Sequence, residues 1–92
     1  MIVMERRPVH GPDFDRFVEV WIDSSDHWKI TLHTGEKETT VSTFTQNTAQ
    51  SRKIAAGVAV AYAAALPSET VVTTGLSMRL HLQNAIRDWS RT

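Results

Sequence analysis

Hydrophobic and polar residues alternate along residues 17–23 and again along residues 27–33. Because successive side chains of a strand point to opposite faces, each stretch predicts a half-buried β-strand. Residues 24–26 have the composition of a turn, so the two strands should form an antiparallel hairpin. If Asp23 pairs with His27, six apolar side chains share one face of the hairpin: Val18, Val20, Ile22, Trp28, Ile30 and Leu32.

An alanine-rich apolar run extends over residues 54–66 and predicts an α-helix. Thr48 can cap its start, and Pro67 disfavours helical geometry in the residue before it. The run is apolar on every side, and a soluble protein surrounds such a helix with other elements. We therefore expect it at the centre of the core, with most of the packing supplied by five side chains: Ile54, Val58, Val60, Tyr62 and Leu66.

Three further segments complete the predicted order of elements. Residues 39–45 are rich in threonine and follow turn residues 34–36, which predicts a third strand at a sheet edge. Residues 69–74 predict a fourth strand, parallel to an earlier one because a helix precedes it. Residues 78–89 place apolar residues at helical spacing and predict a final amphipathic helix.

The composition is that of one globular domain, with an N-terminal arm (residues 1–15) and a core (residues 16–92). In the arm, apolar residues 2–4 either pair as an edge strand or fold over a hydrophobic face. Ten Lys and Arg balance ten Asp and Glu, so no overall field attracts nucleic acid or anionic lipid. The absence of cysteine excludes disulfides and thiolate metal sites.

The central apolar run is too short to span a bilayer, which takes about 20 residues. The first residues also lack the charge and apolar order of a secretory signal. We therefore expect a soluble, cytoplasmic protein without a membrane contact.

The predicted order β-β-β-α-β-α, an α/β (α+β) fold, resembles the N-terminal core of the ribonuclease H fold. The first strand of that family ends in an Asp before a Gly-Ser-like turn, and residues 20–25 (Val-Trp-Ile-Asp-Ser-Ser) are similar. Its Thr- and Asn-rich helix entry and Ala-rich helix resemble residues 45–48 and 55–66, and its strand-end Ser/Thr-Asp-Ser falls at residues 73–76. The resemblance covers residues 17–89 and implies a mixed sheet with both helices mainly on one face.

Most catalytic acids of the family are missing from this sequence. Family catalysis uses two metal ions, which several carboxylates must hold. Only Asp23 remains, because residues 52–55 hold no acid at the helix position and Gly75 stands at the strand-end position. The resemblance therefore implies a non-catalytic protein without a cofactor. We expect it to be a small adaptor or inhibitor that works through protein contacts.

Strand alternation leaves a second set of side chains on the sheet face opposite the helices. Clustered aromatic side chains on an exposed sheet face are typical of an interface with a protein partner or a second copy. The candidate protein-binding residues are Phe17, Trp21, Lys29, His33 and Phe44.

Two weaker constellations point to other functions. A nucleic-acid site could use three basic residues as phosphate contacts: Arg52, Lys53 and Arg79. A βββα unit with a basic helix entry also resembles double-stranded RNA-binding domains. Those domains begin with a helix, which is not predicted for residues 1–15 of this chain. Asp23, Asp26 and His27 could hold one divalent ion, as residual metal-dependent nuclease activity would require. Asp in a hairpin turn more often bonds its own backbone, which is the simpler interpretation.

Overall fold

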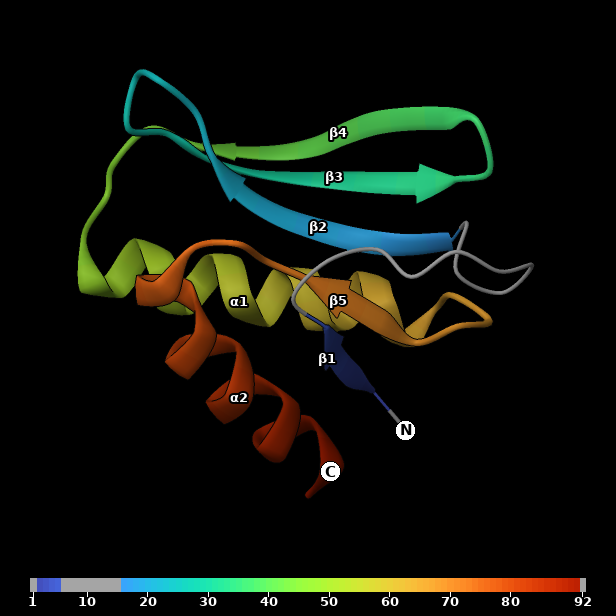
Figure 1. Ribbon diagram of the computed structural model, residues 1–92. Coiled ribbons are helices and arrows are strands. Elements are labelled where there is room, and N and C mark those ends of the chain that lie inside the picture. Colours follow the sequence, from blue (N-terminus) through green and yellow to red (C-terminus); the bar gives the residue numbers. More distant parts are fainter. Residues whose placement is uncertain (1, 6–15, 92) are drawn as a thin grey trace.

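The computed structural model describes residues 2–5 and 16–91, which form one mixed five-stranded sheet and two helices (Figure 1). The strands lie in the order β1-β5-β2-β3-β4, with β2, β3 and β4 antiparallel and β5 parallel to both β1 and β2. The mixed α+β class predicted from the sequence is confirmed. The elements are β1 (Val3–Glu5), β2 (Arg16–Ile22), β3 (Trp28–Thr34), β4 (Lys37–Phe44), α1 (Ala49–Ala64), β5 (Thr70–Val72) and α2 (Leu76–Ser90).

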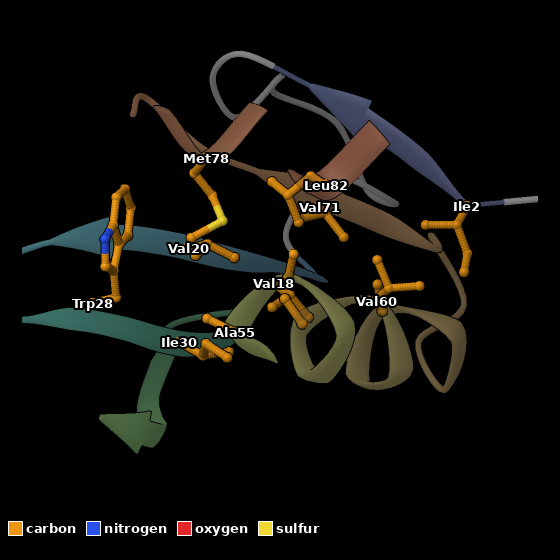
Figure 2. Close-up of a cluster of buried hydrophobic side chains, with 13 residues drawn as sticks. Ile2, Val18, Val20, Trp28, Ile30, Ala55, Val60, Val71, Met78 and Leu82 are labelled. Carbon is orange, nitrogen blue, oxygen red and sulfur yellow. The ribbon is translucent and has the colours of Figure 1, made fainter. Parts of the chain in front are cut away.

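The hairpin of β2 and β3 has the predicted register. Val18 pairs with Leu32, and Val20 pairs with Ile30. Four of their apolar side chains are buried under α1, where Figure 2 shows them pointing toward side chains of the two helices: Val18, Val20, Trp28 and Ile30. Leu32 is half-buried, and Ile22 is 38% exposed, contrary to its predicted place on the buried face. Burial of one face sets this register, because a slip of one residue would turn every apolar side chain into solvent.

The β4 strand corrects one sequence-based expectation, that Phe44 lies on the face opposite the helices. Phe44 pairs with Trp28 and packs against the core on the helix side. The pairing shifts by one residue between Ile30 and Thr31, which is a β-bulge. The many threonines of β4 show no clear alternation, so the sequence alone does not fix which side Phe44 takes.

Helix α1 begins as predicted and is less buried than predicted. Thr48 caps it in a capping box with Ser51, whose backbone N–H donates to Thr48 Oγ1 at 3.1 Å. Ile54 is 50% exposed and Tyr62 is 38% exposed, so the expectation of burial on every side is wrong. The sheet and α2 cover only part of the helix, and small side chains on that part let it approach them closely. Val58 is half-buried, and the fully covered residues are Ala55, Ala56, Ala59, Val60 and Ala63.

Residues 2–4 take the edge-strand role, because β1 pairs in parallel with β5. Ile2 and Met4 point into the helix-side core, and Figure 2 shows Ile2 near Val60. Helix α2 buries Met78 and Leu82 in the same core, as its amphipathic pattern predicts. No helix within residues 2–5 and 16–91 has the length and apolar character needed to cross a membrane.

Candidate functional site

The indole of Trp28 fills the space between the end of β5 and the start of α1. It is 1% exposed, and its Nε1 donates to Asn47 Oδ1 at 2.7 Å. At Gly75 an added Cβ would lie 2.6 Å from Trp28 Cη2. The missing side chain at Gly75 is therefore what makes room for the indole.

Asn47 connects this tryptophan to two charged groups. Its Oδ1 also accepts from Arg52 Nη1 at 2.7 Å, and its Nδ2 donates to Asp26 Oδ1 at 2.9 Å. The first turn, the helix entry and the strand end are thus held together by a set of residues that we call the Trp28 cluster: Asp26, Trp28, Asn47, Arg52 and Gly75.

Asp23 is occupied by the turn that it begins. Its Oδ1 accepts from the backbone N–H groups of Ser25 at 2.9 Å and His27 at 3.0 Å, and Lys29 Nζ lies 3.4 Å from its Oδ2. The hydrogen bond from the His27 backbone is the main cause of a lowered pKa for Asp23, and the Ser25 and Lys29 contacts act in the same direction. The simpler interpretation of Asp23, a backbone-bonded turn residue, therefore holds.

The metal candidates do not converge on one point. Asp26 has a positive φ of 63° and directs its Oδ1 to Asn47 rather than to Asp23. Within residues 2–5 and 16–91, no three His, Cys, Asp or Glu side chains gather closely enough to hold a metal ion.

The three basic candidates have different surroundings. Arg52 is bound to Asn47, and its buried Nε has no hydrogen-bond partner among the described residues. Lys53 is exposed on α1, where it faces His81 of α2 across a groove, and Arg79 is half-buried on α2. Arg52 is therefore a structural residue of the Trp28 cluster as well as a candidate phosphate ligand.

The face of the sheet opposite α1, called the far face below, holds one stacked pair that corrects an expectation. Phe17 is only 8% exposed and stacks on the His33 ring, with centroids 4.3 Å apart. His33 Nε2 lies 2.9 Å from Glu19 Oε1, and its Nδ1 lies 3.6 Å from Glu38 Oε1. Phe17 is thus not an exposed anchor, contrary to the sequence-based expectation.

Trp21 is the far-face aromatic that remains accessible. It is half-buried, its Nε1 donates to Thr31 Oγ1 at 2.8 Å, and Lys29 Nζ lies 5.5 Å from its ring centroid. The hydrogen bond and the cation over the ring hold the indole in one orientation. Trp21 and Lys29 therefore form a preorganised aromatic and cationic surface.

A groove of about 580 Å³ between α1 and α2 is a feature that the sequence analysis missed. An adjoining hollow shares Lys53 and His81 and also touches Ile54. The sequence signal for it is Gly57, the only interruption of the apolar run, where an added Cβ would meet no atom within 4 Å. We call it the helix groove; its lining residues are Lys53, Gly57, Val60, His81, Asn84, Ala85, Asp88 and Trp89.

The fold and these sites define a small α+β domain with an aromatic surface on its sheet. Comparisons with protein families, with curated proteins and with solved structures found no match to the chain.

Proposed function

We propose that this chain is a non-catalytic binding module of ribonuclease H-like type, acting as a small adaptor or inhibitor through contacts with a protein partner or a second copy. The observation that carries the proposal is the oriented indole of Trp21 beside Lys29 on the far face. Tryptophan residues held in one conformation contribute a large share of interface free energy, because little side-chain entropy is lost on binding.

The Trp28 cluster supports the non-catalytic part of the proposal. Where the resembled family would place an acid at the strand end, Gly75 accommodates a buried indole. Where it would place an acid on the helix, Arg52 brings a cation, which repels divalent metal. Asp23, the remaining acid, is bonded to its own turn.

Direct nucleic-acid binding is the alternative from the sequence, and it has less support. Arg52 is bonded within the Trp28 cluster, and the chain carries no net charge. Salt dependence separates the two functions, since a phosphate binder loses affinity steeply as salt rises and an aromatic protein interface loses much less.

We expect the purified protein not to cleave an RNA–DNA hybrid in the presence of Mg²⁺ or Mn²⁺. The physical reason is that Asp23 alone cannot retain two metal ions. The measurement is cleavage of a fluorescently labelled hybrid, with Asp23→Asn protein as the matched control. Turnover that disappears in Asp23→Asn would mean that the domain is an enzyme after all.

We expect Trp21→Ala to weaken association with a partner or a second copy by more than about 1 kcal/mol, roughly fivefold in Kd. The partner is first captured from the native host and identified by mass spectrometry, and self-association is followed by sedimentation. Tyr62→Ala is the matched control, since Tyr62 is an aromatic of α1 that is 38% exposed on the opposite side of the domain. If Tyr62→Ala weakens association and Trp21→Ala does not, the interface lies on the helices.

A further inference from the structure

The helix groove has the size and lining of a small-molecule site. Protein pockets for small ligands measure about 300–1,000 Å³ and combine apolar walls with a few polar groups. Here the buried side chain of Val60 and the bare backbone of Gly57 line one side, and Ala85 and Trp89 line the other. Trp89 is 46% exposed at this side of the groove.

The polar groups of the groove are separated along its length. Lys53 and His81 line both the groove and the adjoining hollow, so they mark one end. Asp88 lies seven residues after His81 on α2, a distance of about 10 Å along a helix. Within residues 2–5 and 16–91, Lys53 forms no ion pair. The cationic end is therefore available to an anion, and Asp88 stands about two turns of α2 away from His81.

We propose that the helix groove binds a small amphipathic carboxylic acid, with its carboxylate at Lys53 and His81 and its apolar part over Gly57 and Val60 toward Trp89. A single carboxylate matches one cationic end, and an alkyl or aromatic group matches the apolar length that follows. The groove volume of about 580 Å³ lies in the range of small-molecule pockets, which favours a ligand over a second copy as the occupant. This site is separate from the far-face surface of the proposed function.

The test is an NMR titration of ¹⁵N-labelled protein with octanoate, below its micellar concentration, and with 1-octanol as the uncharged probe. We expect saturable shifts of the Lys53, Gly57 and Ala85 amides with both probes. Gly57→Leu fills the groove and should weaken the binding of both probes by about tenfold in Kd, the equivalent of roughly two buried methylene groups. Lys53→Gln should weaken the binding of octanoate by up to about fivefold in Kd, as expected for one exposed ion pair. It should leave the affinity for 1-octanol unchanged.

Two matched variants control for the changes of volume and charge. Ala61→Leu puts the same side chain at an exposed position of α1 outside the groove, and Lys37→Gln removes a lysine from β4. Both should bind octanoate as the wild type does. Circular dichroism checks folding, and Gly57→Leu should stay folded because a Cβ there meets no neighbour within 4 Å.

Three results would overturn the proposal. The first is that the amide signals show no saturable shift with octanoate, and the second is that Gly57→Leu and Ala61→Leu lose octanoate affinity equally. The third is that the amide signals of the groove shift with protein concentration when no ligand is present. The last result would identify a second copy as the occupant. Trp21→Ala should leave octanoate affinity unchanged, so a failure of this site and a failure of the far-face surface can be told apart.

Discussion

Trp28→Ala is expected to lower the free energy of unfolding by about 3–5 kcal/mol, the range for removing a large buried aromatic. Trp28 is the largest fully buried side chain within residues 2–5 and 16–91, so its truncation would leave a cavity between β5 and α1. The substitution also removes the Nε1 donor that Asn47 accepts from at 2.7 Å. Domains of this size have total stabilities of about 5–15 kcal/mol, so much of the protein should be unfolded under mild denaturing conditions.

The measurement is urea unfolding followed by circular dichroism, with Trp21→Ala as the matched control. Trp21 is the same residue type but half-buried on the far face, so its loss should cost clearly less. Trp28→Phe should fall between the two, because it keeps an aromatic ring and loses the hydrogen bond to Asn47. If Trp21→Ala costs more than Trp28→Ala, the two faces of the sheet are assigned the wrong way round.

The register of the first hairpin could be predicted because two constraints agree. Alternation assigns the apolar residues of each strand to one face, and the turn at residues 24–26 sets which of them pair. The structure has this pairing, from Val18 with Leu32 to Ile22 with Trp28. The helix cap at Thr48 could be predicted because capping depends on local side-chain chemistry. The parallel position of β5 could be predicted because a helix precedes this strand.

The depth of α1 in the core could not be predicted in this way. An apolar run shows that a helix is compatible with burial on every side, but the number of covering layers depends on the whole fold. Here Ile54 and Tyr62 face outward because one sheet and one further helix do not enclose α1. The side taken by Phe44 depends on a bulge that the threonines of β4 do not signal.

The candidate sites depend on contacts between residues far apart in the sequence. Trp28 and Gly75 are 47 positions apart, and only the folded chain shows that the indole fills the space left by the glycine. From the sequence alone, Gly75 stands where the resembled family has an acid, and Trp28 is one apolar residue among six on the predicted buried face. The helix groove was missed for the same reason, because Gly57 and His81 belong to different helices.

The contact between Trp28 and Gly75 leads to a prediction about a minimal change, Gly75→Ala. The new Cβ would lie 2.6 Å from Cη2 and 3.2 Å from Cζ3 of Trp28. The indole cannot move aside easily, since it is buried and held at Nε1 by Asn47. We expect a loss of about 1–3 kcal/mol in the free energy of unfolding, the usual cost of overpacking a core.

Backbone conformation does not account for this loss, because Gly75 has a φ of −81°, which alanine adopts freely. Gly75 is also the N-cap residue of α2, where alanine is less favourable than glycine by about 0.5 kcal/mol. A double-mutant cycle separates this capping cost from the clash with Trp28. In a Trp28→Phe background the outer indole atoms are gone, so Gly75→Ala should cost only the capping difference.

Gly57→Ala is the control in an open position and should stabilise α1 by about 0.5–1 kcal/mol, because no atom lies within 4 Å of its Cβ. Equal costs of Gly75→Ala in the two backgrounds would show that the indole does not occupy the space beside the strand end.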